Sequence, residues 1–339
     1  MKRMAAALAA IAALSAEAQS APFAIAIHGG AGNFTRASLP PETERQRLAV
    51  LSESLDAGRR VLAAGGTSVD AVVAAVRILE DSPHFNAGKG SVFTAGGANE
   101  MDASIMDGSG RRAGAVAGVT TVRNPVTAAR AVMDKSPHVM LAGRGADAFA
   151  KEQGLEIVDP SYFRTQERWD QLQRARERAG TPLDHDAPKA GAAKKTTALS
   201  GDEKYGTVGA VALDQAGNLA AATSTGGIVN KRHGRVGDSP VIGAGTWAEN
   251  DSVAVSMTGT GEVILRSASA HDVAALVKYK GYTPQKAADE ALAKVKALDG
   301  RAGAIVMDRT GEVAFSFNTS AMYRGYAKGS APAEVRIYR

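Results

Sequence analysis

A threonine at position 207 could act as a nucleophile if the chain were cut in front of it. Residues 206–211 read Gly-Thr-Val-Gly-Ala-Val and open a strand of small apolar residues. A cut between Gly206 and Thr207 would give Thr207 a free α-amine beside its hydroxyl. An α-amine has an ordinary pKa of about 7.7 to 8.0, so near neutral pH it can accept the proton of that hydroxyl. We therefore expect the chemistry of this protein to centre on Thr207.

The segment before this threonine has a composition that argues against folding. Residues 181–204 are rich in Ala, Lys, Thr, Gly and Asp, and they include Pro182 and Pro188 but few large apolar side chains. Such a segment buries too little apolar surface to offset the entropy lost on ordering. We interpret it as a flexible connector that ends at the predicted cut.

The strands and helices that must position Thr207 lie on both sides of the connector. Upstream we expect strands at 23–27, 101–106 and 113–119, and helices at about 41–64, 68–80, 125–135, 145–153 and 164–178. Downstream we expect strands at 207–213, 219–223 and 253–257, helices near 261–280 and 284–298, and a hairpin of 304–307 with 313–317. Because the strands cluster and the helices pair, the pattern predicts a layered α+β fold rather than a doubly wound parallel sheet.

Composition and charge exclude several classes of protein. The chain has 339 residues, of which 45% are hydrophobic, which is ample for a packed core. Its formal net charge is only +5, and its basic residues are interspersed with acidic ones, so nucleic acid is not an expected partner. The absence of cysteine excludes disulfides and thiol chemistry.

The N-terminus has the features of a secretory signal peptide. Lys2 and Arg3 precede an apolar run at 5–14, and residues 16–18 read Ala-Glu-Ala, the small-x-small pattern of a cleavage site. The apolar run is far shorter than the roughly 20 residues that a membrane span requires. We expect residues 1–18 to be removed, with Ser20 as the alternative edge. The mature protein would be periplasmic or secreted, without a membrane anchor.

Six ordered motifs resemble those of the plant-type L-asparaginase and isoaspartyl aminopeptidase (β-aspartyl peptidase) family of N-terminal-nucleophile hydrolases. They are residues 27–32 (Ile-His-Gly-Gly-Ala-Gly), 85–88 (Phe-Asn-Ala-Gly), 206–214, 223–227, 234–240 and 258–262. The resemblance covers nearly all of the mature chain except about 163–204. It implies a four-layer αββα sandwich, made as one inactive chain that cuts itself between Gly206 and Thr207. The products would be an α subunit, residues 19–206, and a β subunit, residues 207–339, assembled as a homodimer of heterodimers.

The same resemblance implies an activity and a role for each matching residue. The expected reaction is hydrolysis of the side-chain amide of L-asparagine, and of β-aspartyl (isoaspartyl) dipeptides, through an acyl-enzyme on Thr207 and without a cofactor. Thr225 would orient the Thr207 hydroxyl. The other implied contacts are oxyanion stabilisation by Thr258 and Gly259, and substrate binding by Arg235 (α-carboxylate), Asp238 (α-ammonium), Gly261 (backbone) and Asn86 (beside the nucleophile).

The pairing of Arg235 with Asp238 has a physical rationale. A guanidinium fork suits a carboxylate, and a carboxylate suits an ammonium group, so the pair would recognise a free amino-acid backbone. The attacked carbonyl would then lie on the side chain of the substrate. This arrangement would explain specificity for β-aspartyl bonds.

A loop at 79–89 resembles the sodium-binding loop of the family. The resemblance implies a structural sodium ion held by the backbone carbonyls of Leu79, Glu80, Ser82, Phe85, Ala87 and Lys89. Hard oxygen ligands suit such an ion, although the residues alone favour a helix C-terminus and turn. The six histidines are scattered, and 184–186 (Asp-His-Asp) lacks a second ligand pair at zinc spacing, so no zinc site is expected.

Two alternatives stay open. The first is a glycosylasparaginase, although such relatives typically carry Asp-Thr where this chain has Gly206 and Thr207. The second is a non-catalytic exported binder of aspartyl ligands that is never cut. Tyr205 stands where many family members have a histidine, which leaves the rate of self-cleavage undetermined. The residues after Arg324 match no motif of the family.

Overall fold

Two β-sheets with helices packed on them make up the part of the chain that the computed structural model describes, residues 22–179 and 206–339. The expected signal peptide at 1–18, the connector at 181–204 and Tyr205 lie outside these ranges. The mixture of helices and sheets confirms the α+β expectation.

The larger sheet has eight strands and places the start of β5 near its centre. Its order is β12 (Glu334–Tyr338), β11 (Ala321–Lys328), β1 (Ala24–Gly32), β5 (Val208–Leu213), β6 (Leu219–Thr225), β2 (Met101–Asp107), β3 (Arg112–Val119) and β4 (Met140–Ala142). All neighbours are antiparallel except β3 and β4. Strand β5 is buried along its whole length between β1 and β6, so Thr207 directly precedes a central strand.

The smaller sheet has four antiparallel strands in the order β10 (Val313–Phe317), β9 (Ala302–Met307), β8 (Ala254–Gly259) and β7 (Thr246–Ala248). One hydrophobic cluster joins residues of both sheets, including Val211 and Leu213 of β5 with Ile305 and Met307 of β9. Alanines 24, 26, 221 and 254 line the same cluster, and such small side chains let two sheets approach closely.

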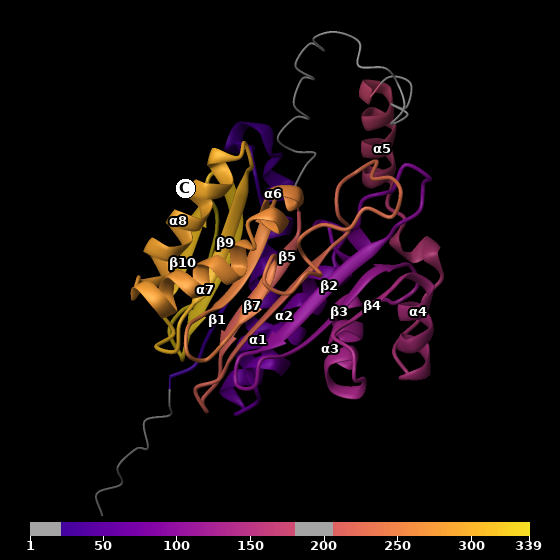
Figure 1. The fold of residues 1–339 in the computed structure, drawn as a ribbon. Helices are drawn as coiled ribbons and strands as arrows, with labels where there is room; N and C mark the ends of the chain where they lie inside the picture. The colour runs from indigo at the N-terminus through magenta and orange to yellow at the C-terminus, as the bar shows by residue number, and fades with distance from the viewer. Residues whose placement is uncertain (1–21, 180–205) are drawn as a thin grey trace, which may run out of the picture.

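Helices cover each sheet through a separate hydrophobic cluster. On the larger sheet the cluster includes residues of α1 (Pro41–Ala63), α2 (Ser68–Asp81), α3 (Pro125–Lys135) and α4 (Gly143–Glu152). On the smaller sheet it includes residues of α6 (Gly261–Arg266), α7 (Ser269–Lys280) and α8 (Pro284–Ala297). Figure 1 shows α7 and α8 beside β9 and β10, and α3 and α4 at the other side near β3 and β4. No described helix is long and apolar enough to cross a membrane.

The last helix of the first segment, α5 (Gln166–Ala179), has its own contacts. It packs Leu172 and Trp169 against Val92, Phe93 and Val229. The ring of Trp169 meets Phe93 edge to face at a centroid distance of 5.3 Å. This contact fixes the helix that leads into the undescribed segment.

The structure corrects the sequence analysis at several places. The expected helical stretch near 261–280 is two helices, because Ala268 has a left-handed backbone with φ 44°. The break lets the amides of Ala270 and His271 donate to the carbonyls of Ala244 and Gly243. No strand was expected at 140–142, 246–248, 321–328 or 334–338, where the structure has β4, β7, β11 and the edge strand β12.

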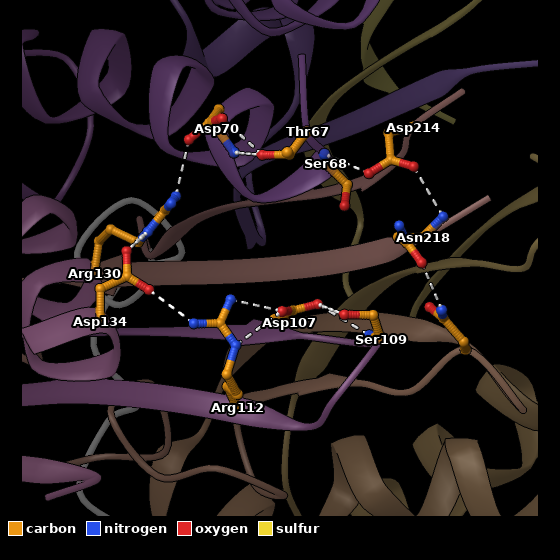
Figure 2. Close-up of polar contacts among 11 residues, drawn as sticks. Thr67, Ser68, Asp70, Asp107, Ser109, Arg112, Arg130, Asp134, Asp214 and Asn218 are labelled. Atoms are coloured by element: carbon orange, nitrogen blue, oxygen red, sulfur yellow. Dashed lines mark hydrogen bonds and ion pairs between the residues drawn. The ribbon is translucent and has the colours of Figure 1, made fainter. Parts of the chain in front are cut away.

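A network of ion pairs ties the β2–β3 hairpin to α2 and α3. Arg112 pairs with Asp107 and Asp134 at N–O distances of 2.9 and 3.0 Å. Figure 2 shows its guanidinium group pointing at both carboxylates. Arg130 binds Asp134 and also Asp70, the latter at 3.0 Å. Such partly exposed pairs contribute little energy singly, but a network of them restricts the relative positions of its elements.

The turn between β5 and β6 is fixed to the start of α2. Asp214 accepts hydrogen bonds from the amides of Ser68 and Asn218, both at 2.9 Å (Figure 2). The Thr67 hydroxyl caps the same helix by accepting from the Asp70 amide at 3.1 Å. These contacts hold the far end of the hairpin that begins next to Thr207.

Glu80 is fully buried near the end of α2. One carboxyl oxygen accepts from the Ser224 hydroxyl at 2.6 Å and from the Val126 backbone amide at 3.0 Å, and the other oxygen has no hydrogen-bond partner among the described residues. Burial raises the pKa of Glu80 from 4.5 to about 8, against a smaller opposing effect of the Ser224 hydrogen bond. The carboxyl group is therefore mostly neutral at neutral pH.

This burial predicts a pH-dependent stability that Glu80→Gln removes. In the unfolded chain Glu80 ionises near pH 4.5, whereas the folded protein resists ionisation until about pH 8. Its contribution to stability is therefore complete below about pH 4.5 and is lost as pH rises toward about 8. The difference in free energy of unfolding between wild type and Glu80→Gln should change with pH across this window, as measured by urea denaturation. A difference that stays constant with pH for Glu80→Gln would refute the assignment.

Candidate active site

The backbone at the predicted cut is enclosed by the loop that carries Asn86. The carbonyl oxygen of Gly206 accepts a hydrogen bond from the backbone amide of Asn86 at 3.0 Å. A Cβ at position 206 would lie 2.7 Å from the Cβ of Asn86, so only glycine fits without displacing the loop. The junction is thus held in a fixed position directly before β5.

The hydroxyls of Thr207 and Thr225 form the centre of the site. Thr207 Oγ1 donates to Thr225 Oγ1 at 3.0 Å, and the Gly227 amide donates to Thr225 Oγ1 at 3.0 Å. The pairing of β5 with β6 brings these threonines together, because Val208 lies opposite Ser224. Thr225 is therefore placed to fix the orientation of the Thr207 hydroxyl, as the motifs implied.

Asn86 supports the wall of the site. Its Nδ2 donates to the Gly227 carbonyl at 2.7 Å, and its Oδ1 accepts from the Val92 amide at 3.0 Å. Both polar atoms of the side chain are thus engaged with backbone. The structure places Asn86 next to the lining of the cleft and gives it a scaffolding contact.

A small cleft opens at Thr207. Its lining brings together five of the residues singled out from the sequence, and the full set is Thr207, Thr225, Gly227, Ile228, Arg235, Gly237, Asp238, Ser239 and Gly259. The lining of the cleft is mostly polar, which suits a ligand that carries charged groups.

Arg235 and Asp238 face a common point beside Gly261. A Cβ added to Gly261 would lie 2.6 Å from Arg235 Nη2 and 2.9 Å from Asp238 Oδ1. Among the described residues Arg235 donates through Nε to Glu262 at 2.9 Å and makes no hydrogen bond through its Nη groups, which leaves both for a ligand. The described side chains thus present a cation and an anion to one small space, as recognition of a zwitterion requires.

Asp238 is buried without a full set of partners. Its Oδ2 has no hydrogen-bond partner among the described residues. Burial raises the pKa of Asp238 to about 7, while Arg235 lowers it by a smaller amount. An incoming ammonium group would satisfy the free oxygen and favour the ionised carboxylate.

Thr258 and Gly259 end β8 at the same cleft. Thr258 is fully buried and its hydroxyl oxygen has no partner among the described residues. Gly259 has φ 146°, and a Cβ there would lie 2.2 Å from the Arg301 carbonyl, so this backbone requires glycine. Gly259 lines the cleft and Thr258 is not among the lining residues, so their role in stabilising negative charge stays a prediction.

Residues 21–337 match the family model described as Asparaginase. The chain belongs to the asparaginase family. It is 50% identical over 316 residues to the isoaspartyl peptidase of Escherichia coli strain K12, covering 93% of this chain and 96% of that protein. It is 43% identical over 299 residues to the isoaspartyl peptidase/L-asparaginase of Mus musculus, covering 88% and 86%. The family and the hydrolase class predicted from the motifs are confirmed.

The sodium-loop-like segment of this asparaginase-family chain folds back on the end of α2. A Cβ on Gly88 would lie 2.3 Å from the Glu80 carbonyl oxygen. The carbonyls of Leu79, Phe85 and Ala87 each accept one backbone amide, which leaves each a second lone pair. Neutral carbonyl oxygens fit a hard monovalent cation. The described residues contain no group of three or more His, Asp or Glu side chains that could hold a metal ion.

Sequence reasoning missed some residues that shape the asparaginase-family site. Glu262 pairs with Arg235, and only its place directly after Gly261 in the last motif could have indicated this. Lys231 is buried and donates to the Glu100 carbonyl at 2.8 Å, close to Gly227. His28 is fully buried and lies near the backbone of Thr207, a contact across the sheet that no local pattern reveals.

The space beside Gly261 predicts the effect of one methyl group. In Gly261→Ala the new Cβ would push apart Arg235 and Asp238, so kcat/KM for L-asparagine should fall at least about tenfold. The melting temperature should stay close to that of wild type. Gly145→Ala is the matched control, because a Cβ there meets no atom within 4 Å. Equal kcat/KM for the two variants would show that the point beside Gly261 does not hold the ligand.

Proposed function

We propose that this protein is an autoprocessed threonine hydrolase that cleaves the side-chain amide of L-asparagine and the isopeptide bond of β-aspartyl dipeptides. The observation that carries the proposal is the 3.0 Å contact between the Thr207 and Thr225 hydroxyls in the cleft that also holds Arg235 and Asp238. The similarity to an isoaspartyl peptidase and to an isoaspartyl peptidase/L-asparaginase supports the same substrates.

The proposed reaction begins with substrate binding through the free amino-acid backbone. The α-carboxylate binds the Nη groups of Arg235, and the α-ammonium binds Asp238. The amine of Thr207, free after the cut, accepts the hydroxyl proton while Oγ1 attacks the side-chain carbonyl carbon. Thr258 and the backbone at Gly259 stabilise the oxyanion, an effect of about 3 to 4 kcal/mol for one donor in other acyl-transfer enzymes.

Collapse of this intermediate expels the nitrogen leaving group and leaves an ester on Thr207. The Thr207 ammonium gives its proton to the departing nitrogen, which leaves as ammonia or as the amine of an amino acid. Water then attacks the ester, with the Thr207 amine taking its proton, and L-aspartate is released. Thr225 holds the oxygen of Thr207 during both steps.

The remaining expectations form part of the proposal. We infer residues 1–18 to be an export signal, and residues 19–206 and 207–339 to be the two subunits of one αββα protomer that dimerises. The three hydrophobic clusters, one between the sheets and one on each outer face, support the four layers. A sodium ion at the carbonyls of residues 79–89 would be structural.

Replacing the nucleophile should separate processing from folding. Thr207→Ala is expected to fold, to remain one chain and to be inactive, because it lacks the hydroxyl needed both for the cut and for attack. Wild type should yield two N-terminal sequences, one near Gln19 and one beginning Thr-Val-Gly-Ala-Val. Thr127→Ala, on α3, is the control and should be cut normally. Activity in Thr207→Ala, or wild type left uncut after prolonged incubation, would disprove the mechanism.

The same processed preparation distinguishes the alternatives. Hydrolysis of β-Asp-Leu without hydrolysis of N-acetylglucosaminyl-asparagine supports the isoaspartyl peptidase assignment. The reverse preference identifies a glycosylasparaginase. A protein that binds L-aspartate but remains a single chain is the non-catalytic binder.

Burial of Asp238 predicts a pH-dependent affinity for the product. The carboxylate must be ionised to bind an ammonium group, and its pKa in the free protein is about 7. The inhibition constant of L-aspartate should therefore rise as pH falls below about 7, approaching about tenfold per pH unit. Asp238→Asn should bind weakly and lose this dependence, whereas Asp251→Asn should keep it. An inhibition constant that does not change between about pH 5 and pH 8 in wild type would contradict the role of Asp238.

A further inference from the structure

Five fully buried polar side chains form a continuous line between the two sheets, which we call the polar seam. They are, in order along the line, His28, Ser256, Thr223, Thr246 and Ser104. His28 Nε2 lies 2.9 Å from Ser256 Oγ, which lies 2.7 Å from Thr223 Oγ1. Thr246 Oγ1 lies 2.6 Å from Thr223 Oγ1 and 2.7 Å from Ser104 Oγ. Each member is therefore within hydrogen-bond distance of the next.

The seam ends at the loop that carries the proposed ammonium-binding carboxylate. Ser104 Oγ lies 2.6 Å from the backbone carbonyl oxygen of Ser239. Ser239 directly follows Asp238, and both residues line the cleft, whereas Ser104 is not among the lining residues. The seam thus contacts the wall of the cleft from behind.

The number of protons fixes the direction of the seam. A backbone carbonyl oxygen only accepts, and each hydroxyl has one proton to donate. Ser104 therefore donates to Ser239, and the contact between Ser104 and Thr246 takes its proton from Thr246. The same count holds at each further contact, so every member donates toward Ser239. The first proton comes from Nε2–H of His28, whose ring is neutral and has one N–H because burial lowers its pKa to about 3.

One further contact of the seam leaves this direction unchanged. Thr223 Oγ1 also lies 3.2 Å from the carbonyl oxygen of Gly245, which is longer than any contact along the seam. If Thr223 gave its proton to Gly245, the 2.6 Å contact between Thr223 and Thr246 would have no proton. Two buried oxygen atoms would then face each other unpaired, which is costly.

The Asp238 carboxylate depends on the backbone for its position. It is buried, and no side chain among the described residues donates a hydrogen bond to it. Its backbone is closely packed, because a Cβ on Gly245 would lie 2.5 Å from the Asp238 carbonyl oxygen. The next carbonyl along the chain, that of Ser239, is held by Ser104. A change at Ser104 would therefore reach the carboxylate through one peptide unit.

We propose that Ser104 is a positioning residue for Asp238, and that the polar seam directs its hydroxyl proton at the Ser239 carbonyl. The inference rests on the proposed binding of the substrate α-ammonium group by Asp238. Ser104 does not line the cleft and touches no substrate atom. It acts by fixing the backbone next to Asp238, so that the carboxylate is in place for an ammonium group. Its contribution therefore falls on the recognition of ligands with an α-ammonium group more than on turnover.

Calorimetry with two matched ligands tests the proposal without depending on catalysis. L-aspartate and succinate carry the same two carboxylates and differ only in the α-ammonium group. At about pH 8 Asp238, whose pKa is about 7, is mostly ionised, and wild type should bind L-aspartate more tightly than succinate. In Ser104→Ala the ratio of the two dissociation constants should fall at least about fivefold, because the carboxylate is no longer held in place.

Ser54→Ala is the matched control. Ser54 is equally buried and donates to the Ala75 carbonyl at 2.8 Å, outside the seam and the lining of the cleft. It should keep the wild-type ratio. An equal fall of the ratio in both variants would show a general effect of losing a buried hydroxyl and would overturn the proposal. Equal weakening of both ligands in Ser104→Ala would also overturn it, because a general loss of structure does not select for the ammonium group.

Kinetics of the processed enzyme separates positioning for binding from an effect on the chemical steps. In Ser104→Ala the KM for L-asparagine should rise at least about fivefold, with kcat within about threefold of wild type. A fall in kcat at an unchanged KM would contradict the proposal.

Nitrogen NMR of protein labelled with ¹⁵N-histidine tests the direction of the seam. The ring of His28 should be neutral, with its proton on Nε2, between about pH 5 and pH 9. A proton on Nδ1 would reverse the seam, would leave the Ser239 carbonyl without a donor from Ser104, and would overturn the proposal even in an active enzyme.

The role of Ser104 and the proposed function can fail separately. A wild type that binds L-aspartate but does not hydrolyse L-asparagine would refute the proposed function, and calorimetry would still decide the role of Ser104. An active wild type that binds L-aspartate no more tightly than succinate would overturn the inference and leave the hydrolase activity standing.

Discussion

The pairing of β5 with β1 on one side and β6 on the other is the constraint on which the site depends. It sets the position of Thr207, because the strand begins one residue later. Through β6 it brings the Thr225 hydroxyl to 3.0 Å from Oγ1, and through β1 it places His28 opposite Gly209. A shift of one residue in either pairing would turn the polar side chains of the strands to the wrong face.

The cleft has polar groups that the free protein leaves unsatisfied. Asp238 Oδ2 and Thr258 Oγ1 are buried without partners among the described residues, and each such group costs about 1 to 3 kcal/mol. A ligand with an ammonium group and a developing oxyanion would relieve both costs. The free energy of folding that these unsatisfied groups cost the ligand-free protein can be regained when a ligand or transition state binds. Active sites commonly reduce stability in this way.

The sequence predicted those helices and strands that are marked by residues within or next to them. The cap at Thr67 marks the start of α2, and the small apolar residues after Thr207 mark β5. The break at Ala268 could not be predicted, because it depends on carbonyls of residues 243 and 244 that are distant in sequence. Strand β12 was missed although Glu334–Tyr338 alternates polar and apolar residues. This segment forms a strand because it pairs with β11. The family motifs located most of the cleft, whereas the contacts of Glu80, Glu262 and His28 arise only from tertiary packing.

The strand order of the larger sheet has a consequence for the life of the folded molecule. From one edge to the other, β12 and β11 come from after the predicted cut, β1 from before it, β5 and β6 from after it, and β2, β3 and β4 from before it. A cut at Gly206 would therefore leave two polypeptides whose strands alternate in blocks within one hydrogen-bonded sheet. Neither polypeptide could leave without dismantling the core of the other. Folding would have to precede the cut, and a processed molecule that unfolds would need its separated chains to meet again. The lifetime of the mature protein would then be set by its rate of unfolding.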